Sequence, residues 1–492
     1  MRNKGKTSGQ HIENLRDEGL KADIAIAGGG GAGLAAAVAA AEKGVKVIVL
    51  EKRHRLGGNS AMAEGFFAAE SPVQKRMMID AQRDMLFRIA MDYAHWKINP
   101  RIVRAFVDKS GDTVQWLEDK GLKIDSVPAL YPNQIPQTWH VLKNGGIDLI
   151  KILRKNCEKL KVKMLLETAG KKLLAGKEGN VTGVLATTKG KEIRIIAKGV
   201  VIATGGYGRN KELLKKYCPT YTDFMENIGL PHIGDGLLMT TEIGGATEDL
   251  GILQLFGPTP GGPPSRLSAV ATEPNTLWVN KRGERFTDEA IGFIFPESAN
   301  TVNQQPDKTS YSILDSKIIQ NIIKQGLIKG EGRLFVAQGT KLTNLGRQLQ
   351  LESEKGRVKI SNTWSKIAKW IGVAHEVLEA TISEYNACCD LGYDKIFCKD
   401  RRYLFPLRTP PFYAIKCHVG FIGTIGGIKI NHRMEVLDLK DRPIQGLYAA
   451  GVDTGGWESD TYCARLSGST FGFAINSGRI AGENAAGYVL NI

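Results

Sequence analysis

The sequence lacks several features that would assign it to common classes of protein. No apolar run among its 492 residues approaches the length of about 18 that crosses a bilayer, so no transmembrane helix is expected. The amino-terminal stretch is basic and polar without an apolar core, which argues against a secretory signal. The seven cysteines show neither a CxxC pair nor a metal-ligand spacing with histidine. We therefore expect reduced thiols, a cytoplasmic protein and no metal site.

Motifs of several other chemistries are missing as well. No haem-attachment or iron–sulfur motif occurs, so electrons for redox chemistry would come from a separate donor, either a carrier protein or a reduced nicotinamide. There is no G-x-S-x-G elbow, P-loop or HExxH motif. The net charge is +15, but the basic residues are dispersed, and we expect no nucleic-acid binding. A positive electrostatic field of this kind would attract an anionic substrate or an acidic electron carrier. A solvated surface rich in lysine, without any such partner, would explain the charge equally well.

The clearest positive pattern occupies residues 23–65. A short apolar run ends in the glycine-rich turn GGGGAG at residues 28–33, and an alanine-rich helical segment follows at 34–42. A second apolar run at 45–50 then ends on Glu51. Strand, glycine turn, helix, strand and terminal acid in this order predict a βαβ unit that carries the dinucleotide-binding fingerprint.

Each residue type in this fingerprint has a physical role. Gly28 permits the tight turn, Gly30 lets the backbone approach a pyrophosphate, and Gly33 lets helix and strand pack closely. The helix N-terminus offers unpaired N–H groups and a partial positive charge to phosphates. Glu51 can accept hydrogen bonds from ribose hydroxyls, whereas a 2′-phosphate there would meet a like charge.

Three segments indicate FAD rather than NAD. The run KRHRLGGNS at 52–60 resembles the FAD-binding family of fumarate reductase flavoprotein subunits. VVIATGGYG at 200–208 resembles the strand and turn that close over FAD in two-dinucleotide-fold flavoproteins, and GLYAAG at 446–451 resembles the late strand that lines the flavin ring. The resemblance implies cofactor binding by Gly28, Gly30, Gly31, Ala32, Gly33, Glu51, Lys52, Gly58, Asn59, Ser60, Ala203, Thr204, Gly205, Gly208, Asp235, Gly451, Gly468 and Ser469.

The resemblance covers nearly the whole chain after about residue 20 and implies its architecture. The expected fold class is α/β, with a two-dinucleotide-binding-fold FAD domain and an inserted α+β cap domain. We expect a flexible segment at residues 1–20, the FAD domain at 21–250 and 411–492, and the cap, which would close over the flavin, at 251–410. The patterns also predict helices within 71–121 and at 147–160, a β-meander at 161–201, one helix at 363–386 and a final helix at 471–486.

Within this family, soluble fumarate-reductase-type proteins are the most similar. The shared motifs are GDG at 234–236, TE at 272–273, GERF at 283–286, FYA at 412–414, GG at 426–427 and RL at 465–466. The family reaction passes a hydride from flavin N5 to one alkene carbon and a proton to the other, with a cation polarising the conjugated carboxylate or carbonyl. Arg465 matches the arginine that binds a substrate carboxylate. A purely structural role, in which Arg465 pairs with a protein carboxylate, stays open.

Several positions depart from the family pattern. Phe293 lies near the place of the proton-donating arginine, and Thr276 replaces an arginine expected three residues after Glu273. The family's histidine pair is replaced by Ile422 and Gly423, and a third histidine falls where Phe256 or Gly257 lies. Polar groups built for a small dicarboxylate have thus become apolar or small. Fumarate itself is not expected, and a bulkier, more apolar substrate fits better.

The proton donor must then be another group, and our first candidate is Tyr462. A phenol can donate a proton in an apolar pocket without a formal charge. The segment around Tyr462 also resembles flavin-dependent 3-ketosteroid dehydrogenases, which use tyrosines. Tyr462 as a packing residue is the competing interpretation. The predicted catalytic residues are Arg465, Tyr462, Glu273 and Thr272.

The sequence therefore predicts an FAD-dependent ene-reductase or dehydrogenase acting on CH–CH groups. Its substrate would be a small unsaturated molecule whose C=C bond is conjugated to a carboxylate or carbonyl. FAD is expected to be non-covalent, because GGNSAMAEG at 57–65 lacks the histidine of family members with linked flavin. A 3-ketosteroid-type dehydrogenase is the second hypothesis. The third, from another class, is an electron-relay flavoprotein without ene chemistry.

Overall fold

The structure is a computed structural model that describes residues 19–333 and 335–491. The expected amino-terminal segment, residues 1–20, lies outside this range except for its last two residues, and Leu20 already begins strand β1 (Leu20–Lys21). In the described parts of the chain, none of the helices offers the length of uncharged, apolar sequence that a bilayer crossing requires.

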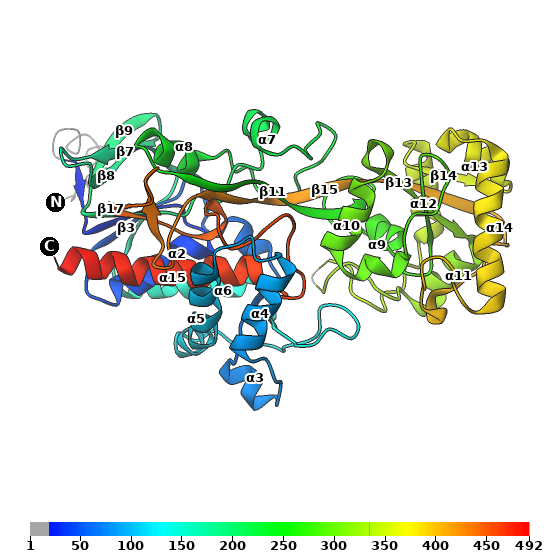
Figure 1. Cartoon of the computed structure of the whole chain (residues 1–492), viewed down its shortest axis with the longest axis horizontal. Helices are drawn as coiled ribbons and strands as arrows, with labels where there is room; N and C mark the ends of the chain where they lie inside the picture. The colour runs from blue at the N-terminus through cyan, green and yellow to red at the C-terminus, as the bar shows by residue number, and fades with distance from the viewer. Residues whose placement is uncertain (1–18, 334, 492) are drawn as a thin grey trace, which may run out of the picture. The chain divides into compact units, whose positions relative to one another are not determined.

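The chain divides into two compact units (Figure 1). The first comprises Met1–Pro219, Leu230–Ile252 and Gly423–Ile492, and the second comprises Thr220–Gly229 and Leu253–Ile422. The chain thus leaves the first unit and returns to it, and each unit is described below by itself.

The first unit is built on a six-stranded sheet in the order β16-β17-β10-β2-β3-β6. Its strands are β2 (Ile24–Ala27), β3 (Val47–Leu50), β6 (Lys163–Leu165), β10 (Gly199–Ile202), β16 (Glu435–Leu437) and β17 (Pro443–Ala449). All neighbours pair in parallel except β16, which is antiparallel to β17. Strands β2, β3 and β10 are buried at every position, as expected for parallel strands covered on both faces. The carboxyl ends of the parallel strands meet at one edge.

Two helices rich in small residues pack closely in this unit: α2 (Gly31–Ala41) and α15 (Ser469–Leu490). A Cβ on Gly478 would lie 2.1 Å from the carbonyl oxygen of Ala32, and one on Gly482 would lie 2.3 Å from that of Ala36. Glycine at these two positions is what allows the backbones to approach. Figure 1 shows α15 in red beside the blue α2.

A second sheet in the first unit has the order β1-β9-β8-β7. Its antiparallel strands β7 (Thr168–Ala175), β8 (Val181–Thr188) and β9 (Lys191–Ile196) confirm the middle of the predicted meander. The prediction was wrong at both ends, because β6 and β10 pair in the six-stranded sheet instead. β10 is a short, fully buried strand, which suits a parallel sheet rather than a half-exposed meander.

Helices and short elements complete the first unit. They are η1 (Gly58–Met62), β4 (Gly65–Phe67), α3 (Pro72–Arg76), α4 (Arg83–Tyr93), α5 (Pro100–Asp119), β5 (Trp139–Val141), α6 (Gly146–Lys159), α7 (Lys211–Tyr217), α8 (Asp235–Glu242) and η5 (Gly451–Asp453). Local signals explain their starts: Ser71 forms a capping box at α3, and Asn99 caps α5 with Pro100 at its first position. The helices predicted within 71–121, at 147–160 and at 471–486 are confirmed.

The second unit combines antiparallel strands with helices. Its elements are α9 (Arg266–Ala271), β12 (Leu277–Asn280), η2 (Glu289–Phe293), α10 (Phe295–Asn303), η3 (Pro306–Lys308), β13 (Thr309–Asp315), α11 (Ser316–Gln325), α12 (Leu345–Glu354), β14 (Val358–Ser361), α13 (Trp364–Ile371), α14 (His375–Leu391) and η4 (Arg401–Tyr403). Strands β11 (Thr247–Thr259) and β15 (Phe412–Ile428) carry the chain through the boundaries between the units. The sheet order is β11-β15-β13-β12, and β14 also pairs with β15.

The single helix expected at 363–386 is two helices, α13 and α14. Gly372 ends α13 in the left-handed conformation, with φ of 90°. This is the usual glycine stop signal for a helix. The helical spacing of buried residues continues on both sides of the break, from Ile367 to Tyr385, which is why the pattern alone predicted one helix.

Candidate active site

The loops at the carboxyl edge of the six-stranded sheet form a glycine-lined turn at the start of α2. Gly28 has φ of 114°, and a Cβ there would lie 2.1 Å from the carbonyl oxygen of Ala203. A Cβ on Gly33 would lie 1.9 Å from the carbonyl oxygen of Gly28. Gly30 is different, because its Cβ would meet nothing closer than 3.9 Å. A side chain at position 28 or 33 would clash with backbone atoms, whereas there is room beside Gly30.

Acidic and basic side chains surround this turn. Glu51, buried directly after β3, accepts hydrogen bonds from the N–H groups of Gly29 at 2.9 Å and Arg53 at 2.8 Å. Lys52 forms an ion pair of 2.7 Å with Asp235 at the start of α8. Lys52 and Asp235 therefore lie side by side, although they come from distant segments of the sequence. Both were predicted to bind the cofactor.

The other predicted cofactor residues also lie in the first unit. Gly31, Ala32 and Gly33 form the first turn of α2; Gly58, Asn59 and Ser60 lie in η1; Ala203, Thr204, Gly205 and Gly208 follow β10; Gly451 opens η5; and Gly468 and Ser469 begin α15. The N–H of Gly31 donates to Ser60 Oγ at 3.2 Å, and a Cβ on Gly451 would lie 3.2 Å from Ala32. The structure brings these segments together at the carboxyl edge of the sheet.

One residue of this edge, Asp453, was not singled out from the sequence. Its buried carboxylate accepts hydrogen bonds from the N–H groups of Gly205 at 2.9 Å and Gly206 at 2.7 Å, and also from Thr204. Burial raises the pKa of Asp453, although these hydrogen bonds oppose the rise. Asp453 fixes the turn after β10. The only sequence signal was an acid two residues after Gly451, at the end of the late strand.

The residues of the turn fit FAD. The first turn of α2 carries no acidic side chain, so no carboxylate opposes the attraction of its positive dipole end for phosphate. The space beside Gly30 suits a pyrophosphate, and Glu51 stands at the end of the second strand, where a ribose hydroxyl would be bound.

The loop between η5 and α15 holds two predicted catalytic residues, Arg465 and Tyr462. Arg465 is exposed, and its guanidinium forms no ion pair with any described residue. Its backbone carbonyl accepts a hydrogen bond from Nε2 of Gln134 at 3.3 Å, so a buried glutamine from the segment between α5 and β5 anchors the loop. Sequence reasoning did not identify Gln134, because no motif surrounds it. The loop is fixed while the guanidinium stays available to a ligand.

Tyr462 and Glu458 are buried in the same loop. The Tyr462 hydroxyl accepts a hydrogen bond from the N–H of Gly468 at 3.1 Å, and burial raises its pKa to about 12. The carboxyl of Glu458 accepts from the N–H of Cys463 at 3.3 Å. Burial raises the pKa of Glu458 to about 8, so this carboxyl keeps its proton at neutral pH. Glu458 was not predicted as a site residue.

The other two predicted catalytic residues, Thr272 and Glu273, lie in the second unit, directly after α9. The buried carboxylate of Glu273 accepts hydrogen bonds from three consecutive N–H groups: Ile328 at 2.6 Å, Lys329 at 2.9 Å and Gly330 at 3.3 Å. Burial nevertheless raises its pKa. Glu273 therefore holds a loop whose central residue is a lysine.

Lys329 is a second residue that the sequence did not reveal. Its Nζ donates to Thr272 Oγ1 at 3.0 Å and forms no ion pair within the described chain. Desolvation lowers the pKa of this ammonium, and the nearby carboxylates of Glu331 and Glu273 oppose the shift. Glu331 in turn contacts the hydroxyl of Ser268. The loop GLIKGEG matches no motif, so only the structure connects Lys329 to the TE pair.

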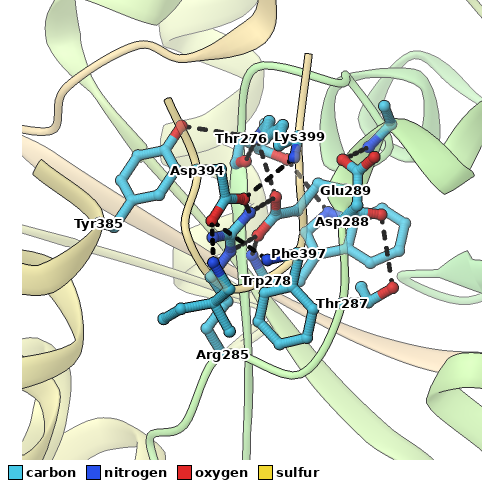
Figure 2. A network of polar contacts seen from close by, with 12 residues as sticks. Thr276, Trp278, Arg285, Thr287, Asp288, Glu289, Tyr385, Asp394, Phe397 and Lys399 are labelled. Atoms are coloured by element: carbon cyan, nitrogen blue, oxygen red, sulfur yellow. Dashed lines mark hydrogen bonds and ion pairs between the residues drawn. The ribbon is translucent and has the colours of Figure 1, made fainter. Parts of the chain in front are cut away.

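A separate charged network fills the interior of the second unit (Figure 2). Arg285 of the GERF motif binds both oxygens of Glu289, at 2.8 and 2.9 Å, and reaches Asp394 at 2.8 Å. Lys399 binds Glu289 at 2.9 Å and the carbonyl oxygen of Thr276 at 2.8 Å. Two cations face two carboxylates, and rings of Phe397 and Tyr385 lie 4.9 and 5.2 Å from the guanidinium.

Two of the positions that depart from the family pattern, Phe293 and Phe256, lie beside other aromatic rings. The ring of Phe293 lies 5.8 Å from that of Tyr403, and the ring of Phe256 lies 6.3 Å from that of Phe295. The arginine expected at position 276 is a threonine whose hydroxyl bonds the carbonyl of Glu273 at 2.8 Å.

Comparisons with known proteins agree with this geometry. The family model of the FAD binding domain matches residues 23–469. A vinyl phenol reductase of Lactiplantibacillus plantarum is 34% identical over 484 residues, which cover 95% of this chain and 96% of that protein.

Two solved structures share the fold. An open conformation of a flavocytochrome c3 fumarate reductase superposes with a TM-score of 0.74 at 27% identity, over 99% of this chain and 83% of that one. A 3-ketosteroid Δ1-dehydrogenase from Sterolibacterium denitrificans has a TM-score of 0.76 at 21% identity, over 95% and 99%, which shows a common fold alone. The chain belongs to the FAD-binding family and is a flavoprotein oxidoreductase of the fumarate reductase type, acting on CH–CH groups.

Proposed function

We propose that this protein reduces the C=C bond of an aromatic alkene that bears an acidic oxygen, either a carboxylate or a phenol. The observation that carries the proposal is the exposed guanidinium of Arg465, which has no carboxylate partner in the described chain although its loop is firmly anchored. An arginine in this state suits a planar, negatively charged group of a substrate.

Two further observations support an aromatic substrate rather than fumarate. Positions where the family pattern calls for an arginine or a histidine hold or adjoin phenylalanines, Phe293 and Phe256, each packed against another ring. The similarity to a vinyl phenol reductase extends over nearly the full length of both chains. An apolar, aromatic surrounding binds a ring better than a second carboxylate.

The proposed division of labour follows from the residues. FAD bound at the carboxyl edge supplies the hydride from its N5. Arg465 binds the acidic oxygen, and Tyr462 is the candidate proton donor, with a pKa that burial raises to about 12. Thr272 and Glu273 belong to the second unit, which we propose to be the cap domain of the enzyme.

The proposal also covers how FAD is held and where its electrons come from. FAD is held without a covalent bond, since residues 57–65 contain no histidine. Electrons come from a separate donor, a carrier protein or a reduced nicotinamide, because the chain has no motif for haem or iron–sulfur clusters. A cytoplasmic location is also part of the proposal, and the seven free cysteines support it.

The test is anaerobic. The bound flavin is reduced chemically, and the return of oxidised-flavin absorbance is followed after adding 4-vinylphenol, cinnamate, fumarate or a Δ4-3-ketosteroid. Rapid reoxidation by the aromatic alkenes and slow reoxidation by fumarate is the expected result. Fast reaction with fumarate would contradict the inferred substrate class, and reaction with steroids alone would favour a ketosteroid dehydrogenase that uses Tyr462. If none of the alkenes reoxidises the flavin, the electron-relay flavoprotein is the hypothesis that remains.

The substitution Arg465→Ala tests whether Arg465 binds the acidic oxygen of the substrate. Arg465→Lys is the control that retains the charge. Removing a charge-assisted hydrogen bond of about 1.5–3 kcal/mol should raise the half-saturating cinnamate concentration roughly 10- to 100-fold. FAD content should not change, since the side chain is exposed and forms no ion pair with a residue that the structure describes. Unchanged saturation by cinnamate in Arg465→Ala would remove Arg465 from substrate binding.

A further inference from the structure

The segment between α5 and β5 runs beside the loop that carries Arg465, and both belong to the first unit. Nε2 of Gln134 donates to the carbonyl oxygen of Arg465 at 3.3 Å and also to Ser467 Oγ. Farther along the segment, Thr138 Oγ1 donates to the carbonyl oxygen of Ser467 at 3.4 Å. Gln134, Thr138 and Ser467 are all buried. The two pieces of chain are therefore joined at more than one point.

The amide of Gln134 also holds each of the two pieces by itself. Its Oε1 accepts a hydrogen bond from the N–H of Leu130 at 2.6 Å, which closes the segment into a turn. Ser467 Oγ, which Gln134 contacts, donates to the carbonyl oxygen of Ala464 at 2.8 Å. Because both the oxygen and the nitrogen of this amide are in use, its orientation is defined. The backbone on both sides of Arg465 is thus fixed by one buried glutamine and its serine partner.

Each of the two pieces presents one exposed side chain in a buried stretch. Arg465 is exposed although the residues before and after it are buried, and the same is true of Ile135, whose side chain is 86% exposed. Isolated exposed apolar side chains are common on proteins. Ile135 differs from most of them because Gln134, the residue before it, contacts the backbone of Arg465. An apolar side chain and a guanidinium are therefore held near one another on the surface of the first unit.

We infer that Ile135 contacts the aromatic ring of the substrate while Arg465 binds its acidic oxygen, and that Gln134 positions the two side chains relative to each other. This inference rests on the proposed function. A ring that covers Ile135 removes apolar surface from water, and an unsaturated acid without a ring cannot gain in this way. Ile135 would therefore favour aryl alkenes over small ones, whereas Arg465 would serve both.

The first experiment compares cinnamate with acrylate, which has the same carboxylate and C=C bond but no ring. Half-saturating concentrations are measured by anaerobic flavin reoxidation in the wild-type protein, Ile135→Ala and Ile135→Leu. Ile135→Ala should raise the value for cinnamate roughly 3- to 30-fold and leave the value for acrylate within about twofold, because only the ring loses apolar contact. Ile135→Leu keeps an apolar side chain of the same size, so both values should stay within about threefold.

A matched control is available in the same unit. Leu439 is 82% exposed and lies in the turn between β16 and β17, at the amino end of β17 and thus at the opposite edge of the sheet from the cofactor turn. Leu439→Ala should change neither half-saturating concentration. An equal rise for cinnamate and acrylate in Ile135→Ala, or no rise for either, would overturn the inference, and the proposed function would stand as long as the wild-type protein reduces cinnamate. A wild-type protein in which no alkene reoxidises the flavin would overturn both.

The second experiment tests Gln134 as a positioning residue. Gln134→Leu removes the amide at similar volume and should raise both half-saturating concentrations about 3- to 10-fold, because Arg465 binds both acids and loses a hydrogen bond that fixes its backbone. The limiting rate of reoxidation at saturation should stay within about threefold. If Gln134→Leu only lowers stability and leaves both half-saturating concentrations unchanged, Gln134 has a purely structural role. Ile135→Ala, at an exposed position, tests the ring contact even if Gln134→Leu does not fold.

Discussion

Lys399 and Lys329 lie in the same unit, and desolvation lowers the pKa of both, yet their partners differ. Lys399 binds the carboxylate of Glu289 at 2.9 Å, and neither side chain is exposed. Lys329 binds only the hydroxyl of Thr272, and the carboxyls near it form no ion pair with it in the described structure. One ammonium is neutralised by its surroundings, and the other is not.

The carboxyl groups beside the two lysines show the same contrast. Burial would raise the pKa of Glu289, but Lys399 and Arg285 outweigh it and lower the pKa below its ordinary value. Near Lys329, by contrast, burial dominates, and the pKa values of Glu273 and Glu331 are raised. A paired carboxylate stays ionised and serves the fold, whereas groups with opposed pKa shifts near one another are typical of proton transfer.

The largest expected difference between the two lysines is in stability. Lys399→Met leaves a buried carboxylate with one cation fewer and should lower the free energy of unfolding by about 3–5 kcal/mol. Lys329→Met removes no ion pair and loses one hydrogen bond of a charged group, so it should lower the free energy of unfolding by less, about 1.5–3 kcal/mol. Denaturant unfolding of the two variants side by side measures this. Equal losses would show that Lys329 is as structural as Lys399, and would contradict the comparison.

Glu458, a buried acid of the first unit, differs from Glu289 because no cation is among the groups that shift its pKa. Glu458 has a pKa of about 8, raised by burial. Between the ordinary glutamate value of about 4.3 and pH 8, the folded protein keeps a proton that the unfolded chain has released. Stability contributed by this group is therefore full below about pH 4.3 and is lost as pH rises, by about 1.4 kcal/mol per unit.

Glu458→Gln should abolish this slope, because an amide does not titrate and still offers an oxygen to the N–H of Cys463. The measurement is denaturant unfolding of wild type and variant between pH 5.5 and 8.5, whose difference should move in favour of the variant as pH rises. Parallel curves for the two proteins would mean that Glu458 is ionised and paired, like Glu289.

The cofactor turn could be predicted from sequence because its requirements are local. Gly28 and Gly33 are needed by backbone atoms that would lie within about 2 Å of any Cβ, and such needs leave a short, regular motif. Lys329 could not be found in this way. It lies 57 residues from Thr272, in a loop whose composition resembles any glycine-rich turn. Asp453, which binds a turn 249 residues earlier, escaped for the same reason.

The helix break at Gly372 teaches a related lesson about patterns. Apolar spacing reports which faces are buried, and both α13 and α14 bury the face that one continuous helix would bury. The candidate catalytic positions were harder still, because the resemblance indicated which arginines are missing at Phe293 and Thr276 but not which side chains the fold brings near them. A lost side chain is visible in a sequence, whereas a compensating one is a matter of tertiary contact.

The smallest expected effect comes from a matched pair of threonines, Thr272 beside Lys329 and Thr276 beside Lys399. Thr272→Val removes the acceptor of the Lys329 ammonium without changing side-chain volume much. Because Thr272 is a predicted catalytic residue, the change should slow alkene-dependent reoxidation roughly 10- to 100-fold, as a lost hydrogen bond to a charged group of about 1.5–3 kcal/mol implies. Thr276→Val removes a partner of the Trp278 indole N–H beside Lys399 and should cost stability but not rate. Stopped-flow rates and unfolding curves of both variants decide the matter. If Thr276→Val slows the reaction as much as Thr272→Val does, then the rate depends on the packing of the whole unit and not on Thr272 itself.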